Sequence, residues 1–394
     1  MNVLVVNIGS TSFKFRVLDM ADERVIARGG VEGISKPVSK VSIQIGAGRP
    51  TVTEQQVADQ PGAVQLCLRE LAASGAPAAV HIDAVGFKAV HGGLLPEAVP
   101  VTEEVIDAME ELSDAVPAHN PPYVAAMRAF KKDLPGVPLV AAFETGFHHT
   151  IPASRTTYAI PWDWTTRYGV RRYGFHGASH RYVATRTAEL LGRDNLRIIS
   201  CHLGGSSSVC AIRDGQSVAT SFGMTPQTGL PQNNRVGEFD PYALPLLAAR
   251  TGKNTNQLLA EMSIRGGLLG ISGVSNDMEQ IIAATRSGSD RAELAVEVYT
   301  EAVRDCIGAY LVALGGLDVL VFTGGIGERS PEIRERVCRG LEFLGIALDP
   351  ARNPAPPVDA KLSTDDSKVV VLAMETNEEL IVARQTERVL EGQA

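Results

Sequence analysis

The sequence predicts an α/β protein made of two related halves. Apolar runs of about four to six residues alternate with helical patterns of about ten to twenty, an alternation typical of α/β folds. A strand, a Gly/Ser turn and a second strand occur near the N-terminus and again at mid-chain. The length of 394 residues suggests two to three structural units. With 44% hydrophobic and 21% charged residues, the chain is neither disordered nor collagen-like nor a coiled coil.

The repeated unit is a hairpin around small polar residues. In the first copy, a strand over residues 3–6 meets a turn at 7–12 and a second strand at 13–18. In the second copy, a strand over 197–201 meets a turn at 202–208, a strand at 209–212 and the turn Asp214-Gly215. Rossmann and P-loop units have a strand-to-helix turn instead. The repeat therefore predicts two halves with related cores.

The second half of the chain predicts long helices and a closing strand. Ser330 is expected to cap a helix with Pro331 at its first position and Gly345 as its stop. A last strand over 368–374 precedes a closing helix, for which Thr376 and Glu379 form a capping box. Another helix is expected over residues 291–314, and its apolar stripe consists of Leu294, Val298, Ile307, Leu311 and Leu314.

Charge and cysteine content exclude several classes of function. Lys+Arg 37 against Asp+Glu 45 gives a net charge of -8, which argues against broad binding of nucleic acid or anionic membranes. The five cysteines are odd in number and include no C-x-x-C pair, so we expect reduced thiols. The N-terminus lacks the basic region of a signal peptide, and the longest apolar stretch, 310–322, is too short to cross a bilayer. We expect a soluble, cytoplasmic protein.

Three Gly-rich turns favour a nucleotide site. A turn at 323–328 joins those at 7–12 and 202–208, and it opens the helix that Ser330 caps. Backbone N–H groups in such turns can hold phosphate oxygens, although either of the first two turns taken alone is more typical of an ordinary hairpin. The Walker A pattern is absent and the dinucleotide fingerprint is incomplete.

Several polar residues are candidates for chemistry, each with a simpler alternative. His176 and His180 are four apart, yet the Glu of a zinc H-E-x-x-H motif is missing, so hydrogen-bonded histidines are the expectation. Arg235, in a Gly/Pro/Asn/Gln-rich stretch at 223–241, either binds an anion or is solvated. The capping box leaves Glu378 to bind a divalent cation or to face solvent.

The order of the motifs from end to end resembles that of the acetate kinase family. These motifs are Asn7-x-Gly9-Ser10-x-Ser12-x-Lys14, Val90-His91-Gly92-Gly93, His119-Asn120-Pro121-Pro122, Phe147-His148, Tyr173-Gly174-Phe175-His176-Gly177-x-Ser179-His180, His202-Leu203-Gly204, Gly325-Ile326-Gly327-Glu328 and Thr376-Asn377-Glu378-Glu379-Leu380.

The resemblance implies two domains of the actin-like ATPase (ribonuclease H-like) type with a nucleotide cleft between them. The first domain would contain residues 1–148 and 378–394, and the second residues 149–377. The implied activity is reversible phosphoryl transfer from ATP to a short carboxylate, which gives ADP and an acyl phosphate such as acetyl phosphate. Mg²⁺, or alternatively Mn²⁺, would assist, and the protein would be a homodimer.

The resemblance also assigns roles to residues. The implied catalytic residues are Glu144, His176 and Arg235. The implied site for the acid contains Lys88, Val90, Phe175 and Pro226. The implied nucleotide contacts are Lys14, His202, Leu203, Gly204, Gly205, Ser206, Asp277, Met278, Glu279, Gly325, Ile326, Gly327, Glu328 and Arg329. The implied metal ligands are Asn7 and Glu378.

The sequence departs from the family pattern at several of these positions. Lys88 replaces an arginine and keeps the charge without the two-pronged fork, while Glu144 replaces an aspartate one methylene shorter. We expect these two changes to compensate each other. The other departures are Gly205-Ser206 for Asn-Gly, Asn233-Asn234 for Gly-Thr, Glu279 for Arg and Arg329 for Asn.

These departures leave alternatives open. The chain could phosphorylate another short acid, such as propionate or butyrate, or use another phosphoryl donor such as pyrophosphate. It could also be a catalytically impaired paralogue that binds nucleotide or acyl phosphate.

Overall fold

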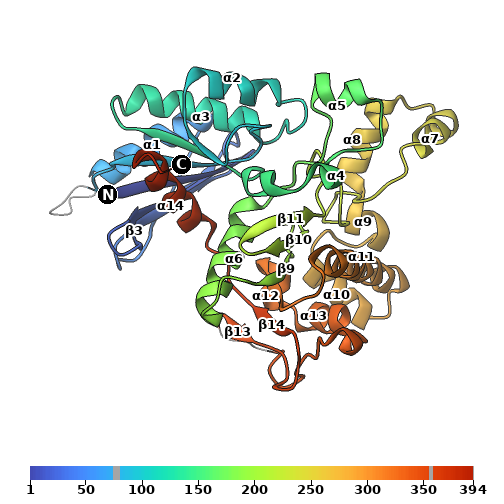
Figure 1. The fold of residues 1–394 in the computed structure, drawn as a ribbon. Helices are drawn as coiled ribbons and strands as arrows, with labels where there is room; N and C mark the ends of the chain where they lie inside the picture. The colour runs from blue at the N-terminus through green and yellow to red at the C-terminus, as the bar shows by residue number, and fades with distance from the viewer. Residues whose placement is uncertain (74–79, 355–357, 394) are drawn as a thin grey trace. The chain divides into compact units, whose positions relative to one another are not determined.

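The protein divides into two compact units. In the computed structural model, which describes residues 1–73, 80–354 and 358–393, unit 1 comprises Met1–His149 and Asn377–Ala394, and unit 2 comprises Thr150–Thr376. Ala394, the last residue of the predicted first domain, lies outside the described residues. Each unit has its own sheet and its own apolar core (Figure 1).

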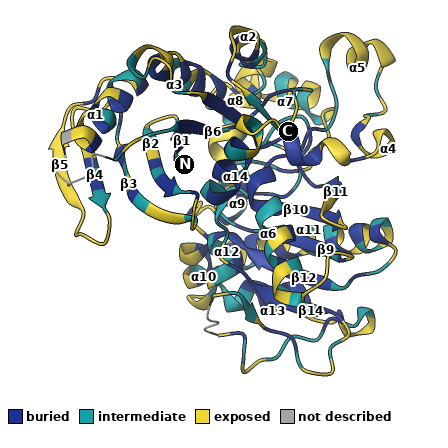
Figure 2. Ribbon diagram, turned by 60° about the vertical axis from the view of Figure 1, so that its left-hand side comes forward, coloured by how far each residue is buried: buried dark blue, intermediate teal, exposed yellow. Residues whose placement is uncertain are grey.

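Unit 1 is built on an eight-stranded sheet in the order β5-β4-β3-β2-β1-β6-β8-β7. The strands from β1 to β5 pair antiparallel, whereas β1, β6 and β8 run parallel. The strands are β1 (Asn2–Gly9), β2 (Ser12–Asp19), β3 (Arg24–Glu32), β4 (Ser39–Ile45), β5 (Thr51–Gln55), β6 (Ala84–Ala89), β7 (Ala98–Pro100) and β8 (Leu139–Phe143). All of β5 is exposed, as the yellow edge strand of Figure 2 shows.

Helices cover both faces of the parallel part of this sheet. They are α1 (Gln60–Ala73), α2 (Glu103–Glu111), α3 (Asn120–Asp133) and α14 (Glu378–Leu390), with a 3-10 turn at Gly146–Thr150. Neighbouring residues of β6 point to opposite faces, so Phe87 packs edge-on against Phe130 of α3 while Gly86 lies against Thr386 of α14. A Cβ at Gly86 would collide with the Thr386 hydroxyl, and glycine thus allows the C-terminal helix to dock closely.

Unit 2 contains a six-stranded sheet in the order β11-β10-β9-β12-β14-β13. The strands are β9 (Arg197–His202), β10 (Ser208–Arg213), β11 (Gln216–Thr220), β12 (Val319–Thr323), β13 (Ala360–Lys361) and β14 (Val370–Ala373). The helices are α4 (Ala153–Thr156), α5 (Trp162–Tyr168), α6 (Gly177–Leu191), α7 (Ala243–Thr251), α8 (Thr255–Arg265), α9 (Gly267–Ser272), α10 (Met278–Arg286), α11 (Asp290–Leu314), α12 (Gly324–Arg329) and α13 (Pro331–Cys338), followed by a 3-10 turn at Glu342–Leu344.

The prediction of two related halves is confirmed by the strand order. An antiparallel meander of three strands, β1-β2-β3 or β9-β10-β11, begins each sheet, and two further strands run parallel to its first member. The predicted turn at Asp214-Gly215 joins β10 to β11, and both residues have positive φ, as a two-residue hairpin turn requires. The first hairpin turn is shorter than predicted, because β1 continues through Asn7 to Gly9 and β2 begins at Ser12.

Three local predictions are wrong in detail. Helix α11 has the expected span, but Leu294 and Val298 are exposed, and Ala295, Val296 and Tyr299 pack into the core instead. Ser330 does cap α13 by accepting a hydrogen bond from the Ile333 N–H, but that helix ends at Cys338 rather than near Gly345. The closing helix is capped by Asn377, whose side chain accepts from the Leu380 N–H, and not by Thr376.

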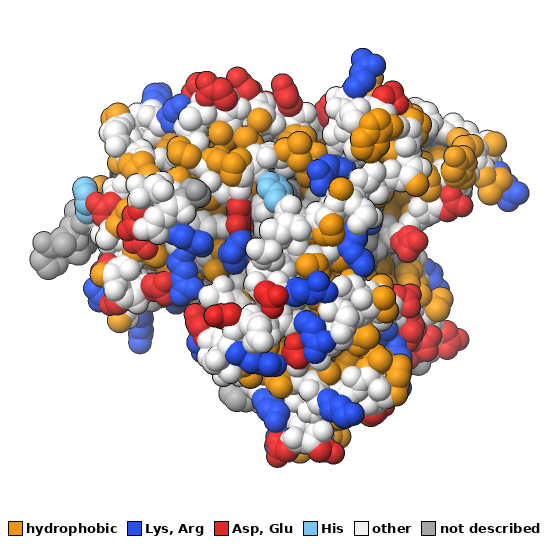
Figure 3. Space-filling model, in the orientation of Figure 1, with side chains coloured by type: hydrophobic (Ala, Val, Ile, Leu, Met, Phe, Trp, Pro, Cys, Tyr) orange, Lys and Arg blue, Asp and Glu red, His pale blue; other side chains and the backbone are white. Residues whose placement is uncertain are grey.

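Other features of the chain agree with the composition. All five cysteines are free, and all except Cys306 are buried. No described helix is long and apolar enough to span a bilayer. Figure 3 shows acidic and basic side chains intermixed over the face that it draws.

Candidate active site

In unit 1, Lys88 lies between two carboxylates. It projects from β6, and its Nζ atom forms an ion pair with Glu378, the first residue of α14. The same Nζ is 3.8 Å from Oε1 of Glu144, which directly follows β8. All three side chains are at least 85% buried. Burial alone would lower the pKa of Lys88, but the charges of Glu378 and Glu144 outweigh it and raise that pKa above its usual range.

The hydroxyl of Tyr123 supports the first hairpin beside this cluster. Tyr123 is fully buried, and its hydroxyl oxygen accepts a hydrogen bond from the Ile8 N–H at 2.9 Å. Burial raises the pKa of this phenol above its usual range. Asn7, which pairs with Lys14 on β2, directly precedes Ile8. The tyrosine therefore holds the end of β1 beside Asn7, the predicted metal ligand.

Asn7 and Glu378 fit a magnesium ion by their chemistry. An amide oxygen and a carboxylate oxygen are hard donors, and Mg²⁺ in proteins commonly takes one or two carboxylates together with waters and substrate phosphates. Among the described residues, no group of three or more His, Cys, Asp or Glu could hold a metal by itself. The next residue, Glu379, pairs with Arg16 at 3.7 Å.

In unit 2, Arg235 is held by neighbours that the sequence did not reveal. Its Nη1 donates to Ser206 Oγ at 2.8 Å and to Gln232 Oε1 at 3.2 Å. Gln232 is fully buried, and the same oxygen also accepts from the Ser206 hydroxyl and the Ser207 N–H. Burial lowers the pKa of Arg235 from its usual value. The arginine is therefore oriented, and not a solvated loop residue.

His176 has an unusual backbone and a serine partner. Its φ of +61° places it in the left-handed region, which costs non-glycine residues energy and is often found at functional sites. It immediately precedes α6, and its Nδ1 is 2.9 Å from Ser208 Oγ. Its ring lies 4.1 Å from that of His202 in a tilted arrangement and meets Phe222 edge-on at 5.1 Å. The alternative of a zinc pair is disfavoured, because serine hydroxyls bind both ring nitrogens of His180.

The residues expected around the methyl group of the acid are distributed over both units. Val90 is half-buried and belongs to unit 1, whereas Phe175 and Pro226 belong to unit 2. Phe175 is buried and meets Phe222 edge-on at 5.6 Å, which makes it a fixed wall. The Pro226 carbonyl accepts a hydrogen bond from the Gln232 amide.

A pocket of about 390 Å³ in unit 2 collects most of the predicted nucleotide contacts. Those that line it are Gly204, Gly205, Asp277, Met278, Glu279, Gly325, Ile326 and Arg329. Asp277 also caps α10, and Met278 points mainly into the core. Lys14 belongs to unit 1, where it pairs with Glu32 and lines a groove on β2 to β5.

The remaining predicted nucleotide contacts stabilise the loops that form the pocket. Leu203 is fully buried, and its carbonyl accepts from the N–H groups of Ile326 and Gly327. His202 is held by Ser179 at 2.7 Å, and Ser206 by Gln232. Glu328 accepts a hydrogen bond from the Gly324 N–H, and burial raises the pKa of its carboxyl. These residues fix the loops rather than line the pocket.

The third Gly-rich turn differs from its prediction, because it forms the short helix α12 before α13 begins. Arg334, a fully buried arginine of α13, fastens this helix. Its Nη1 donates to the carbonyls of Gly327 and Glu328, both at 2.7 Å, while Nε donates to the Asn353 side chain at 2.8 Å. Burial lowers the pKa of Arg334 to about 10.

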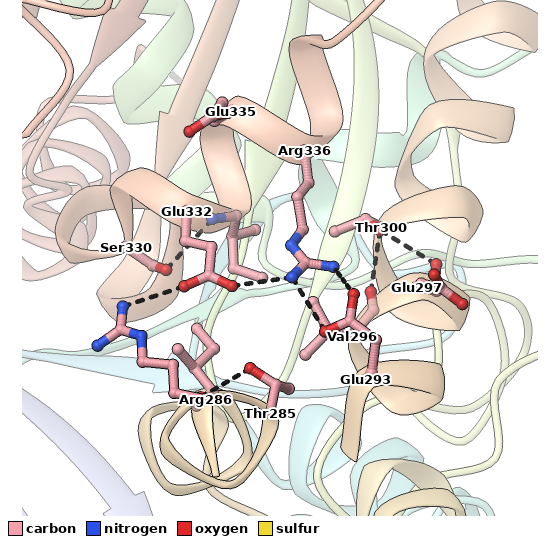
Figure 4. Close-up of polar contacts among 12 residues, drawn as sticks. Thr285, Arg286, Glu293, Val296, Glu297, Thr300, Ser330, Glu332, Glu335 and Arg336 are labelled. Carbon is pink, nitrogen blue, oxygen red and sulfur yellow. Dashed lines mark hydrogen bonds and ion pairs between the residues drawn. The ribbon is translucent and has the colours of Figure 1, made fainter. Parts of the chain in front are cut away.

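Charged residues brace the helices on one side of the pocket (Figure 4). Glu332 of α13 accepts from Arg286 of α10 at 3.1 Å and from Arg336 at 3.0 Å, and Arg336 also grips Glu293 of α11 with two nitrogens. The exposed Arg286 contributes little energy, but the network fixes α10 relative to α13.

Asn233 and Asn234, which replace Gly-Thr of the family pattern, form hydrogen bonds of their own. Asn234 accepts from the Asn276 amide at 3.0 Å and donates to the Ile264 carbonyl at 2.7 Å. With its amide oriented to satisfy its neighbours, Asn233 donates to the carbonyls of Gly205 and Asn276. The two asparagines thus tie the Gly205 turn to the segment before Asp277.

Sequence reasoning missed four residues that hold the others in place: Ser208, Phe222, Gln232 and Arg334. No pattern in the sequence distinguishes them, since their roles depend on contacts that only the fold creates.

Comparison with known proteins gives a consistent result over the whole chain. The sequence profile of the acetokinase family matches residues 2–384. The chain is 41% identical to the acetate kinase of Bacillus subtilis (strain 168), over 98% of each chain, and 44% identical to that of Dictyoglomus thermophilum, over 99% of each. The crystal structure of Porphyromonas gingivalis acetate kinase superposes with a TM-score of 0.91 at 39% identity, covering 99% of each chain. A propionate kinase from Francisella tularensis superposes with a TM-score of 0.92 at 30% identity, covering 98% of this chain and 99% of its own.

Proposed function

Because the chain belongs to the acetokinase family, it is a kinase that phosphorylates a carboxylate, and we propose that acetate is its acid. It transfers a phosphoryl group reversibly from ATP to a short carboxylate, which gives ADP and an acyl phosphate. With acetate the product is acetyl phosphate. The observation that carries the proposal is the identity of about 40% to acetate kinases along the full length of the chain.

In this proposal, Lys88 binds the carboxylate of the acid, and Glu144 orients the Lys88 ammonium. The 3.8 Å contact between them supports this assignment, and the surrounding burial strengthens each charge interaction. Val90, Phe175 and Pro226 contact the methyl group. Phe175 packs edge-on against Phe222, which supports a role for its ring as an apolar contact for the acid.

The transfer itself needs positioning and charge neutralisation more than proton transfer. A carboxylate is already a nucleophile, and the transition state spreads negative charge over three phosphoryl oxygens. Arg235 would neutralise part of this charge, which for an arginine in that role is worth about 10³–10⁵ in rate. His176 would donate a hydrogen bond to one of the same oxygens. The nucleotide would occupy the 390 Å³ pocket in unit 2, and Lys14 would contact its phosphates.

Asn7 and Glu378 would hold Mg²⁺, or Mn²⁺ in its place. A bound divalent cation supplies neutralising charge to the phosphate oxygens of the nucleotide. In the structure Glu378 is paired with Lys88, so the chain itself provides a cation at this carboxylate when no metal is bound.

We also propose a cytoplasmic homodimer. Free, largely buried cysteines are compatible with a reducing compartment. Tyr242, Leu246, Leu259 and Ile264 are exposed apolar side chains on or beside α7 and α8, and such groups commonly mark a protein interface. Light scattering coupled to size exclusion measures the mass, and a value near twice 41.9 kDa is expected.

The proposed reaction is tested with a matrix of acids and donors. Acetate, propionate and butyrate are each incubated with ATP, GTP or pyrophosphate and Mg²⁺, and hydroxylamine traps the acyl phosphate as a hydroxamate. The highest kcat/KM is expected for acetate with ATP. Greater efficiency with propionate, or with pyrophosphate, would replace the substrate assignment while keeping the reaction type. No product from folded protein that binds nucleotide would favour an impaired paralogue.

A further inference from the structure

His180 is a fully buried histidine to which the proposed reaction gives no task. It lies in the first turn of α6, one turn after His176. Its Nδ1 is 2.9 Å from Ser200 Oγ on β9, and its Nε2 is 2.9 Å from Ser208 Oγ on β10. Ser208 Oγ is also 2.9 Å from Nδ1 of His176. The chain Ser200–His180–Ser208–His176 therefore connects the core of unit 2 to the proposed catalytic histidine.

The number of available hydrogen atoms determines which group donates and which accepts along this series of hydrogen bonds. A hydroxyl donates one hydrogen, and a neutral imidazole has one donor and one acceptor nitrogen. Among the described residues, the Ser200 hydroxyl has no hydrogen-bond partner other than His180, and it is fully buried. An unpaired buried O–H is costly, so Ser200 donates to Nδ1 of His180. His180 then carries its proton on Nε2 and donates to Ser208.

The next step follows from the same count. Because Ser208 Oγ accepts from His180, its own hydrogen is available for Nδ1 of His176. Nδ1 of His176 is then an acceptor, and the proton of the neutral ring lies on Nε2. The reverse direction, with protons on the Nδ1 atoms, would leave the buried Ser200 hydrogen without an acceptor.

A neutral His176 also fits its other surroundings. It stands at the N-terminal end of the 15-residue helix α6, where the helix dipole disfavours a positive charge. A protonated His176 would donate from Nδ1 as well, and Ser208 would then face two donors with no acceptor for its own hydrogen.

We propose that Ser200, His180 and Ser208 are positioning residues that hold His176 as the neutral tautomer with its proton on Nε2. That tautomer presents an N–H donor to the transferring phosphoryl group without adding a charge that must later be removed. The use of this donor rests on the proposed function, whereas the tautomer itself does not.

The tautomer can be measured without turnover. In protein labelled with ¹⁵N-histidine, two-bond ¹⁵N–¹H correlation spectra distinguish a protonated ring nitrogen from an unprotonated one, and His176→Gln assigns the signals. The expected result for the whole protein is a protonated Nε2 and an unprotonated Nδ1 at His176. A protonated Nδ1 overturns the proposal, whatever the kinase activity.

Variants separate positioning from simple packing. Ser208→Ala is expected to mix the two tautomers of His176 and to lower kcat at least about ten-fold, with little change in KM for the acid. Ser208→Thr keeps the hydroxyl and is expected to restore the Nε2–H signature. The matched control is Ser221→Ala, which removes a neighbouring buried hydroxyl that accepts from the Val209 N–H and, within the described residues, forms no hydrogen bond to a histidine.

Each outcome decides the question. If the His176 tautomer is unchanged in Ser208→Ala, the proposal that Ser200, His180 and Ser208 hold that tautomer is overturned. An equal change in Ser221→Ala overturns it as well. If Ser208→Ala does not fold, Ser200→Ala tests the same chain from its far end and is expected to allow the Nδ1–H form. If the protein has the expected tautomer but forms no hydroxamate, the positioning role of the three residues stands and the proposed function is contradicted.

Discussion

The ammonium of Lys88 and the carboxylate of Glu378 form an ion pair across 290 positions of the chain. The pair joins the strand β6 to the start of α14, both within unit 1. With Glu144 on its other side, Lys88 lies between two carboxylates. The sequence departure from arginine to lysine thus lies where it affects the acid site and the proposed metal ligand together.

Removing this cation should destabilise the protein in a manner that Mg²⁺ repairs. In Lys88→Met, Glu144 and Glu378 keep their charges in a largely buried site, and we expect a loss of about 3 kcal/mol in unfolding free energy. Added Mg²⁺ should raise the melting temperature more in the variant than in the parent protein. Thermal unfolding with and without Mg²⁺ measures this. Lys131→Met, which breaks the exposed pair with Glu103, is the control and should change stability by less than about 1 kcal/mol. Equal losses in both variants would contradict the idea.

Lys88 and Glu144 should behave as one compensated change. Lys88→Arg lengthens and widens the cation, and Glu144→Asp shortens the acid, so each alone disturbs the 3.8 Å contact. We expect each single variant to lower kcat/KM for acetate, and the double variant to recover part of the loss. The interaction energy in the double-mutant cycle should be about 0.5–3 kcal/mol. Strictly additive effects would show that the two residues act independently.

Arg235 should be needed for turnover and not for folding. We expect Arg235→Ala to reduce kcat about 10³-fold or more, because it removes a cation from the transferring phosphoryl group. Ser206→Gly removes only one of the two contacts that orient the guanidinium, and Gln232 remains, so its loss should stay within about ten-fold. Hydroxamate assays and melting curves check both. Arg250→Ala, on the exposed end of α7, should be neutral in each measurement.

Arg334 should couple the stability of unit 2 to nucleotide binding. Arg334→Met leaves the carbonyls of Gly327 and Glu328 without their buried donor, and we expect a destabilisation of about 3 kcal/mol or more. The loosened α12 should also raise KM for ATP. Lysine cannot supply donors to three acceptors in one plane, so Arg334→Lys should rescue neither property. Urea unfolding and nucleotide titration measure the two effects. Arg339→Met, at an exposed position, serves as the control, and similar losses there would contradict the assignment.

The sequence was sufficient for the architecture because periodicity reports burial directly. The hairpin of residues 197–212 and the helix that ends at Leu314 were predicted to within a residue or two. The stripe of that helix was wrong at Leu294 and Val298, because α11 buries small and aromatic residues such as Ala295 and Tyr299 that a search for aliphatic spacing overlooks. The cap of α14 was wrong by one residue, since Thr376 and Asn377 are both favoured at this position and the prediction took the threonine, although asparagine is the stronger N-cap.

Less of the candidate site than of the fold could be predicted from the sequence. The residues proposed to carry the chemistry, such as Arg235 and His176, can be identified from the order of the motifs along the sequence. The residues that orient them cannot, because Gln232 and Ser208 are ordinary polar residues until the fold brings them to their partners. The same holds for Lys88, whose pairing with Glu378 depends on where the last helix returns.

The return of α14 to unit 1 has a consequence for how the protein is made. During synthesis, residues 1–149 leave the ribosome long before residues 377–390, so one face of the β1–β6–β8 sheet stays uncovered while all of unit 2 is translated. The cavity that Gly86 leaves for Thr386 is filled only at the very end. A nascent chain that stalls after unit 2 would therefore contain the complete pocket proposed for the nucleotide but no Glu378, and the exposed face of its first unit would be open to chaperone binding.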